Sequence, residues 1–365
     1  MTACCLERQA RARYERGSPA VICRTRRFFQ DRGFLPADIS AYPVFSAFSQ
    51  YSLLQEMSAP IISSWSFAYH GLYKLIGGCL CAIYFHEAKP IYFTIHRSPG
   101  ALSRTALARI IEILYGLCRE AGLPFLQIRF VDEKYLADFE GIQGYRLETR
   151  RHPQDDEYVY RVEDLLELSG TVNFYKRKRI RRCSALEGLS LRPLTRANAG
   201  ECLIIEDAWC RGKDCVSCAS FGGCEREALR NMVELFDERR QRGLLLYHGE
   251  ERAGYVICER ISEKLAFLYF GKAVIEGFFV FLIYRLFTEP HTREYLEGLE
   301  YLNINEDMGS PGLRLFKSHL SAHELWPKYI CTYTAGDPEG PSPQGTMRTG
   351  GALPGISFPS AGPLH

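Results

Sequence analysis

The 365-residue sequence lacks a long uncharged hydrophobic run. Near the middle of its first half, the stretches without Asp, Glu, Lys or Arg include residues 57 to 73 and 75 to 85, separated by Lys74. Both are shorter than the roughly 18 strongly apolar residues that a membrane-spanning helix needs, and the first contains Ser, His and Pro. The sequence therefore predicts no transmembrane segment.

The sequence also lacks a short basic stub followed by an apolar run at its N-terminus, which is the pattern of a secretory signal peptide. Residues 7 to 32 instead hold eight Arg and three acidic residues. We therefore expect a cytoplasmic protein, in which most of the 14 cysteines are reduced thiols rather than disulfides.

A large excess of one charge is missing as well. The chain has 45 Lys and Arg against 43 Asp and Glu, a formal net charge of +2. This balance excludes a histone-like polycation and an acidic solvating protein, so any site for nucleic acid or lipid has to be local. Hydrophobic residues make up 46% of the chain and aromatic residues 13%, which predicts a globular protein with two domains.

The composition divides the chain into four segments. Residues 1–33 are rich in Arg and are predicted to form a basic N-terminal arm. Residues 335–365 are rich in Gly, Pro and Ser and have no apolar period, which is typical of a disordered tail. Between them we expect an N-terminal domain over residues 34–165 and a C-terminal domain over residues 166–334.

The N-terminal domain carries clear local signals. Two β-rich runs at 80–85 and 91–95 predict a hairpin, and a further strand is expected at 125–131. Ser103 is a candidate N-cap and Gly122 a candidate stop for the helix between these strands. The apolar residues of that helix follow a 3.6-residue period: Leu107, Ile110, Ile111, Leu114 and Cys118.

The C-terminal domain repeats this pattern more fully. In chain order it predicts a helix with an apolar stripe at 229–236, strands at 244–247, 255–258 and 265–270, a helix at 277–287, a strand at 301–304, a helix at 313–319 and a strand at 328–334. This order resembles the GNAT acyltransferase fold, in which a central helix follows directly on a strand, although another α+β domain would also match. The predicted fold class is α+β, with two tandem GNAT-like domains of mixed sheets flanked by helices, the first of them degenerate.

Two motifs carry a more specific resemblance. The first runs from Asp155 to Leu165 and continues through residues 168–170 to Lys176 and Arg177. The second runs from Tyr301 to Gly309 and continues through residues 312–314 and 317–318 to Lys328 and Tyr329. Both resemble a bacterial family related to the C-terminal domain of phosphatidylglycerol lysyltransferase. Weaker agreement comes from Trp209, Cys210, Glu225, Lys272 and Gly277.

The resemblance implies a transferase built from two GNAT-like domains. Such a protein moves an aminoacyl or acyl group from an activated donor, a charged tRNA or an acyl-CoA, to an amine or hydroxyl of a small molecule or lipid headgroup. The sequence departs from the family pattern at three positions, where Lys178 replaces Asn, Gly271 replaces Glu and Ile304 replaces Arg. The alternative is therefore a non-catalytic module that binds RNA or anionic ligands on the same fold.

Candidate catalytic residues follow the strand at 301–304. A carboxylate in a partly apolar cleft can take a proton from the attacking group, so Glu306 or Asp307 is a candidate base and Asn303 a candidate binding residue beside them. Asp307 alternatively caps the next helix or shapes the turn before it. Tyr329 is a candidate general acid, with a core tyrosine as the alternative.

Candidate donor-binding residues lie at the central helix and on the short helix after it. Lys272 and Gly277 precede the central helix, whose N-terminal N–H groups can hold phosphates, although the segment is alternatively an ordinary turn. It lacks the Gly-rich pyrophosphate loop of CoA-dependent members. Arg314 and Lys317 share one face of the short helix and could clamp a phosphate or carboxylate, unless that face is simply solvated.

Residues 176–182 form a basic run of six Lys and Arg in seven positions, beginning with Lys176 and Arg177 and preceded by Phe174 and Tyr175. Such a run can bind the acceptor end of an RNA, a polyphosphate or anionic lipid headgroups, and it can also be a solvated surface.

Four cysteines lie close together, namely Cys210, Cys215, Cys218 and Cys224. Four thiolates can hold zinc, and part of the spacing resembles a plant-type iron–sulfur pattern. Separate core and loop thiols are the alternative.

Overall fold

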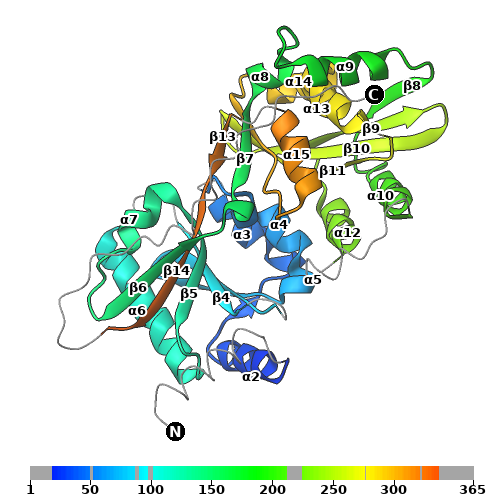
Figure 1. Cartoon of the computed structure of the whole chain (residues 1–365). Helices are drawn as coiled ribbons and strands as arrows, with labels where there is room; N and C mark the ends of the chain where they lie inside the picture. The colour runs from blue at the N-terminus through cyan, green and yellow to red at the C-terminus, as the bar shows by residue number, and fades with distance from the viewer. Residues whose placement is uncertain are drawn as a thin grey trace.

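The computed structural model of the chain describes residues 19–49, 52–86, 90–97, 102–211, 224–275, 277–320 and 323–336. These residues form two mixed β-sheets of seven strands each, flanked by helices and lying in two lobes (Figure 1). The predicted α+β class is therefore confirmed.

The first sheet has the strand order β1-β2-β3-β4-β5-β14-β6. Only the β4–β5 pair is parallel among its neighbouring strands. Its strands are β1 (Leu35–Pro36), β2 (Leu72–Ile76), β3 (Cys79–Tyr84), β4 (Tyr92–His96), β5 (Leu126–Asp132), β6 (Tyr145–Arg151) and β14 (Lys328–Ala335). The helices that accompany it are α2 (Pro19–Gln30), α3 (Tyr42–Ser49), α4 (Ala59–Ser64), α5 (Ser66–Tyr69), α6 (Arg104–Glu120) and α7 (Leu136–Phe139). The 3-10 turns are η1 (Ile39–Ala41), η2 (Gln55–Met57), η3 (Glu133–Tyr135) and η4 (Pro153–Asp155).

Helix α6 forms where its sequence signals predicted it. The Ser103 hydroxyl accepts the backbone N–H of Ala106 at 3.2 Å and caps the helix. Gly122 follows the last turn with φ +76°, a backbone conformation that favours glycine. The five predicted apolar residues are all buried in the first core. Phe29 of α2 joins that core, so the described part of the basic arm is a packed helix.

The second sheet has the strand order β13-β7-β12-β11-β10-β9-β8, and its β11–β12 pair is parallel. Its strands are β7 (Glu157–Arg161), β8 (Leu189–Pro193), β9 (Gln241–His248), β10 (Glu251–Arg260), β11 (Leu265–Ala273), β12 (Tyr301–Asn303) and β13 (Glu324–Trp326). Its helices are α8 (Val162–Leu166), α9 (Phe174–Ser184), α10 (Glu201–Arg211), α12 (Glu225–Leu235), α13 (Phe278–Thr288), α14 (Pro290–Leu296) and α15 (Pro311–His319).

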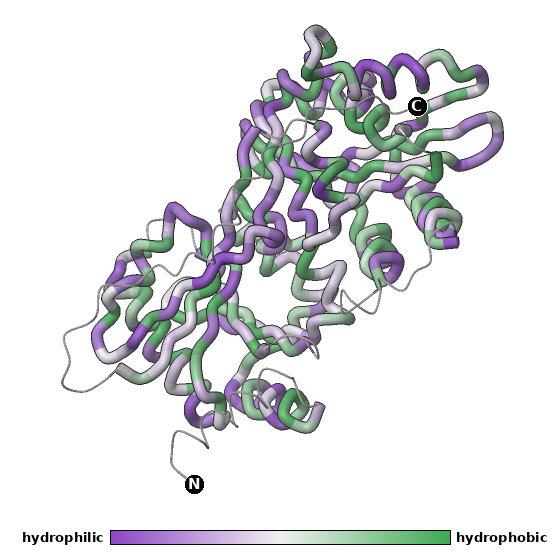
Figure 2. The backbone as a smooth tube through the Cα atoms, viewed as in Figure 1, coloured by the Kyte–Doolittle hydropathy of each residue, from purple (hydrophilic) through white to green (hydrophobic). Residues whose placement is uncertain are grey.

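The two faces of the second sheet have separate cores. Helix α13 covers one face and packs against α9 and β10, and most of its side chains are buried because apolar residues occur around nearly its whole circumference. Helices α10 and α12 cover the other face, where α4 of the first half also packs against α12. Figure 2 shows the contrast between the apolar α13 and the strongly hydrophilic α9 at the top of the view.

The two halves of the chain exchange a strand. β7 lies in the second sheet between β12 and β13, and β14 returns to the first sheet between β5 and β6. Each sheet therefore contains strands from both sides of the expected domain boundary between residues 165 and 166. The exchanged strands begin at Glu157 and Lys328, and the connections run through the middle of the molecule, between the lobes (Figure 1).

Within the described ranges, none of the helices combines the length and the apolarity that crossing a bilayer requires.

Candidate functional site

The candidate site lies where β11 and β12 part. The two strands pair in parallel from Leu265 and Tyr301 to Phe267 and Asn303, after which β12 ends and β11 continues to Ala273. Such a gap leaves backbone groups on β11 without a strand partner.

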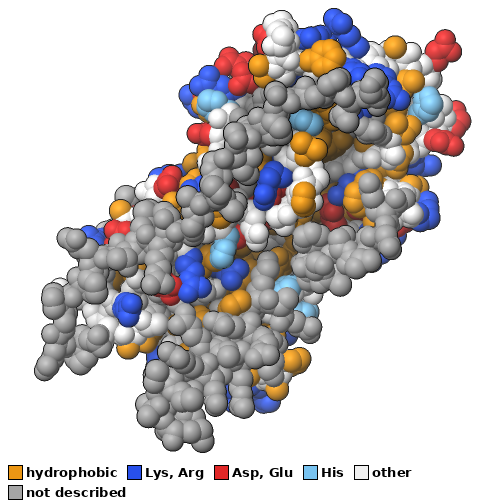
Figure 3. Space-filling view, viewed as in Figure 1, with side chains coloured by type: hydrophobic (Ala, Val, Ile, Leu, Met, Phe, Trp, Pro, Cys, Tyr) orange, Lys and Arg blue, Asp and Glu red, His pale blue; other side chains and the backbone are white. Residues whose placement is uncertain are grey.

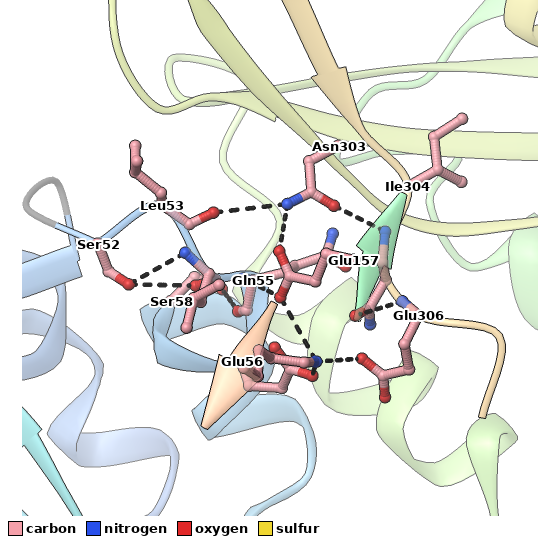
Figure 4. Close-up of polar contacts among 12 residues, drawn as sticks. Ser52, Leu53, Gln55, Glu56, Ser58, Glu157, Asn303, Ile304 and Glu306 are labelled. Carbon is pink, nitrogen blue, oxygen red and sulfur yellow. Dashed lines mark hydrogen bonds and ion pairs between the residues drawn. The ribbon is translucent and has the colours of Figure 1, made fainter. Parts of the chain in front are cut away.

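A segment of the first half occupies this gap. The Gln55 side-chain N–H donates to the Leu268 carbonyl at 2.7 Å, and the Asn303 side-chain N–H donates to the Leu53 carbonyl at 3.4 Å (Figure 4). Residues 53–57 therefore join the two halves at the strand edge where sequence reasoning expected chemistry.

Glu157 lies at the centre of these contacts and is completely buried. One carboxylate oxygen accepts the Gln55 backbone N–H at 2.8 Å, and the other accepts a side-chain N–H of Asn303. The Asn303 side-chain oxygen Oδ1 in turn accepts the Asn305 backbone N–H at 2.8 Å. Asn303 therefore links the buried carboxylate to the loop that carries Glu306 (Figure 4).

Three carboxylates surround one ammonium group at this point. Lys328 is 3% exposed, and its Nζ contacts Glu306 Oε2 at 2.6 Å, Glu157 Oε1 at 3.6 Å and also Glu56 Oε1. The three acids come from η2, β7 and the loop after β12. Their oxygen atoms lie within 4.8 Å of one another, a spacing that could hold a metal ion. The Lys328 ammonium already lies among them, so we infer no metal site.

Burial changes the acidity of this cluster. It raises the pKa of Glu306 to about 8, with the Glu56 charge adding to the effect and Lys328 opposing it. It also raises the pKa of Glu56 to about 7, again against the effect of Lys328. Burial disfavours the charge of Lys328, but the surrounding carboxylates outweigh that cost and raise its pKa. A carboxyl whose pKa lies near neutrality can exchange protons with a substrate.

Lys317 fixes the turn that presents Glu306. Its Nζ donates to the carbonyls of Ile304, Asn305 and Glu306 at 2.6, 2.8 and 2.6 Å. Burial lowers the pKa of this amine to about 8. All three N–H donors of Lys317 therefore bind backbone carbonyls of this chain. Lys317 and Arg314 do not form the expected clamp for a phosphate or carboxylate, because Arg314 pairs with Asp307.

Asp307 is held differently from its neighbour. It accepts the Tyr158 hydroxyl at 2.8 Å, Arg314 Nε at 2.8 Å and the Gly309 backbone N–H at 2.8 Å. Its burial alone would raise the carboxyl pKa, but the Arg314 guanidinium and these hydrogen bonds lower it. Asp307 therefore anchors α15 to β7, while Ser310 caps that helix.

Tyr329 lies apart from the carboxylate cluster, although it follows Lys328 directly. Its hydroxyl donates to Glu133 Oε1 at 2.9 Å, and its ring belongs to the core of the first sheet. Successive strand residues point to opposite faces, which explains the separation.

Lys176 and Arg177 also contact the chain itself. Lys176 is 2% exposed and donates to the Asp164 carbonyl, while Arg177 Nη1 donates to the carbonyls of Leu168 and Gly170 at 2.5 and 2.9 Å. Lys176 thus binds helix α8, and Arg177 binds the loop before α9.

The outward face of α9 carries Lys178, Arg181 and Arg182, which are exposed. Figure 3 shows basic side chains gathered at the upper edge of the molecule, where Figure 1 places α9.

Lys272 belongs to a second polar cluster, on the face covered by α10 and α12. A register shift in the β10–β11 pairing precedes it, and such bulges re-aim side chains. Lys272 Nζ lies over the Trp209 ring at 4.4 Å from the centroid and donates to Glu225 at 2.8 Å. Cys210 Sγ lies 4.0 Å from Glu206 Oε1 on the same helix, α10.

Gly277 begins α13 with φ +90°, and a Cβ there would lie 2.9 Å from Arg179 Cδ. The Arg179 side chain therefore covers the start of the central helix.

Gly271 makes room for an aromatic ring. A Cβ at this position would lie 2.3 Å from a ring carbon of Phe279, which itself packs against Phe316 with centroids 5.4 Å apart. The space beside Gly271 on this face is thus occupied by Phe279. Ile304, another of the three departures from the family pattern, is buried in the same core.

The structure covers only half of the cysteine group. Cys210 lies near the end of α10 and Cys224 directly precedes α12, whereas Cys215 and Cys218 lie outside the described residues. The zinc site stays a prediction.

Three residues of the cluster were missed as candidates from the sequence. Glu157 and Lys328 are part of the two family motifs, which was a signal that could have singled them out. Glu56 belongs to no motif, and only the fold brings it to Lys328.

Comparison with known proteins agrees with this architecture. Residues 99–332 match the family model described as phosphatidylglycerol lysyltransferase, C-terminal. No curated protein matches the chain. Its fold, two tandem GNAT-like domains, recurs in several solved structures.

A protein of unknown function from Bacteroides thetaiotaomicron has 22% identity and a TM-score of 0.71, with 82% of this chain and 99% of that chain covered. The C-terminal domain of a putative lysylphosphatidylglycerol synthetase from Agrobacterium fabrum has 12% identity and a TM-score of 0.55, with 80% and 91% covered. L-PGS from Bacillus licheniformis has 14% identity and a TM-score of 0.53, with 82% and 93% covered.

At these identities the solved structures establish the fold alone. The family and the fold together suggest chemistry of the aminoacyl- or acyltransferase type. Since the family model matches residues 99–332, well over half of the sequence, the chain belongs to the family defined by the C-terminal region of phosphatidylglycerol lysyltransferase.

Proposed function

We propose that this protein transfers an aminoacyl or acyl group from an activated donor, a charged tRNA or an acyl-CoA, to an amine or hydroxyl acceptor. The acceptor is a small molecule or a lipid headgroup. The observation that carries the proposal is Glu306, a carboxyl with a pKa raised to about 8 at the point where β11 and β12 part. Family membership supplies the reaction class.

In this proposal Glu306 is the general base. The acceptor nitrogen or oxygen attacks the carbonyl carbon of the donor, and Glu306 takes the proton that the acceptor loses. The bond from that carbonyl to the donor breaks, and the leaving hydroxyl of the tRNA or thiol of CoA departs with the proton that Glu306 has taken up. Asn303 and Lys317 hold the loop of Glu306 in place and do not touch the reacting atoms.

A polyanionic donor would dock on α9. Lys178, Arg181 and Arg182 are exposed on this helix, whereas the Lys176 and Arg177 side chains bind backbone carbonyls of α8 and of the loop after it. Charge complementarity and counterion release favour tRNA or the phosphates of CoA on this surface. The cytoplasm, where both donors occur, is the proposed compartment.

Two observations favour a second candidate, a non-catalytic module that binds RNA or anionic ligands. Residues 53–57 fill the gap between β11 and β12, and the Phe279 ring fills the space beside Gly271. A protein that has lost its chemistry would keep α9 as a binding surface. Binding without turnover would identify this candidate.

A transfer assay distinguishes the transferase from the non-catalytic binding module. Purified protein is incubated with a mixed pool of tRNAs charged with labelled amino acids, and in parallel with labelled acetyl-CoA, with a crude bacterial extract as the source of acceptors. Transfer of label into a new product from either donor supports the proposal and identifies the donor. Intact donors in both reactions, together with tRNA binding, would contradict it and favour the binding module.

A further inference from the structure

The carboxylates of the site outnumber its cations. Glu56, Glu157 and Glu306 meet around the single ammonium of Lys328. The neighbouring cations are engaged elsewhere, because Lys317 donates to three backbone carbonyls and Arg314 pairs with Asp307. Two carboxylates held close together in a buried site cannot both ionise at low cost.

The contacts of Glu157 leave the excess charge to the other two acids. Both of its oxygens accept N–H donors, from the Gln55 backbone and the Asn303 side chain. Neither oxygen therefore has to carry a proton. In contrast, Glu56 Oε2 is buried and has no hydrogen-bond partner among the described residues. A proton between Glu56 and Glu306 satisfies that atom and removes one negative charge.

Glu56 belongs to the first half of the chain, whereas Glu306 belongs to the second half. Glu56 lies on η2, whose first residue Gln55 donates to the Leu268 carbonyl, and the Leu53 carbonyl, two residues before η2, accepts from Asn303. Lys328, which bridges the two acids, begins the exchanged strand β14. The contact of Glu56 with Glu306 thus depends on the docking of residues 53–57 against the second sheet.

We propose that Glu56 is a positioning residue that shares a single proton with Glu306 over the ammonium of Lys328. This inference deepens the proposed function, since it assigns the protonation of the proposed base to a residue of the first half. The pH at which the base of one half ionises then depends on whether residues 53–57 of the other half are docked. Undocking of η2 would leave Glu306 paired with Lys328 alone and ionised.

Other titratable groups also face the pair. Lys328 and Glu157 contact it directly, Lys317 and Asp307 lie beside Glu306, and the Tyr92 hydroxyl lies near Glu56. Burial raises the pKa of Tyr92 far above neutrality, and the Asp307 carboxyl is paired with Arg314, so neither titrates near pH 7. Burial lowers the pKa of Lys317 to about 8, so its amine is largely protonated at pH 7, where it donates to backbone carbonyls.

Infrared spectroscopy tests the proposal without an activity assay. Exposed carboxyls are ionised at pH 7, so the band of protonated carboxyls reports buried groups. We expect the wild-type band to exceed those of Glu56→Gln and of Glu306→Gln by one carboxyl each, because either substitution leaves the remaining acid paired with Lys328. Glu259, whose pKa burial raises to about 7, contributes equally to all three proteins and serves as internal reference.

Proton-linked stability gives a second readout. The folded protein keeps the shared proton between about pH 5 and pH 8, whereas the unfolded chain has released it, so stability falls as the pH rises through this range. Glu56→Gln flattens that fall by one proton, and the exposed control Glu250→Gln leaves it unchanged.

The infrared and stability measurements test the shared proton independently of the proposed transfer reaction. An unchanged carboxyl band and an unchanged pH slope in both Glu56→Gln and Glu306→Gln would overturn proton sharing, whatever the transfer assay gives. If one variant does not fold, the other decides, since each removes one partner of the same proton. If both variants lose one carboxyl from the band but the wild type shows no transfer, the shared proton is upheld and only the proposed reaction is rejected.

Discussion

At the scale of single residues, neighbouring acids have different surroundings and therefore different chemistry. The Glu306 carboxylate pairs with a lysine that it shares with two other carboxylates, and its pKa is raised. Asp307 has an arginine of its own and two further donors, and its pKa is lowered. The assignment of the base to Glu306 rests on this difference.

Asp307→Asn is expected to reduce stability by about 1–3 kcal/mol, because it weakens the buried contacts with Arg314 and Tyr158 without changing side-chain size. Urea unfolding at pH 7 measures this change. Glu306→Gln is the matched comparison and should cost less at the same pH, since its carboxyl is largely protonated there. Equal losses in the two variants would contradict the assignment.

A second prediction concerns Gly271. Gly271→Ala places a Cβ against the Phe279 ring and should cost about 1–3 kcal/mol. In a Phe279→Leu background the same substitution should cost less, because the ring carbon in conflict is gone. Thermal unfolding of the four proteins measures the coupling. Strictly additive losses would mean that the ring does not occupy the space beside Gly271.

The sequence predicted part of this site. The position of Glu306 and Asp307 at the end of a strand was enough to make both candidates, but their partners decide between them, and partners depend on packing. Glu56 and Lys328 are 272 positions apart, so no local pattern joins them. Tyr329 and Lys176 have suitable chemistry and belong to family motifs, yet they contact Glu133 and the Asp164 carbonyl respectively.

At the scale of elements, the strongly periodic segments were predicted well. Helix α6 and the run from β9 to α13 formed within a few residues of the expected bounds, because amphipathic period, caps and glycines agree there. The short helices α3, α4 and α5 and the strands β6 and β13 were not predicted. Their sequences are short or mixed in polarity, and packing against the rest of the molecule stabilises them.

Helix α9 carries two kinds of basic residue, some exposed to solvent and others bound to backbone carbonyls. The two kinds should respond differently to substitution. Simultaneous Lys178→Gln, Arg181→Gln and Arg182→Gln should weaken tRNA binding and flatten its salt dependence, with stability unchanged within about 0.5 kcal/mol. Arg177→Gln removes hydrogen bonds to the Leu168 and Gly170 carbonyls and should lower stability by about 1–3 kcal/mol instead.

Salt-dependent filter binding and urea unfolding measure the two effects of that prediction. Equal salt slopes for the wild type and the triple variant would reject α9 as the docking surface.

At the scale of the whole molecule, strand exchange joins the two halves of the chain. β7 and β14 each lie between strands of the other half, so neither sheet is complete without both halves. No sequence signal predicted this exchange. The local pattern indicates that residues 328–334 form a strand, but the sheet that a strand joins is decided by long-range packing.

The exchange predicts a single unfolding transition. Urea unfolding followed by tryptophan fluorescence and by far-UV circular dichroism should give coincident curves, because unfolding of either sheet removes a strand from the other. Truncation after Trp326 removes β14 and should abolish the cooperative transition. Two separate transitions in the full chain would show that the sheets unfold independently.

The central claim is that Glu306 acts as base in a transfer reaction, and the pH dependence of transfer in the wild type and in Glu306→Gln tests it most directly. The account predicts that wild-type transfer rises with pH to a plateau above about pH 8 as the carboxyl ionises. It also predicts that Glu306→Gln loses roughly a hundredfold or more in rate while keeping its fold and its tRNA binding. Wild-type rates and an unchanged pH profile in Glu306→Gln, with Glu250→Gln as control, would contradict it.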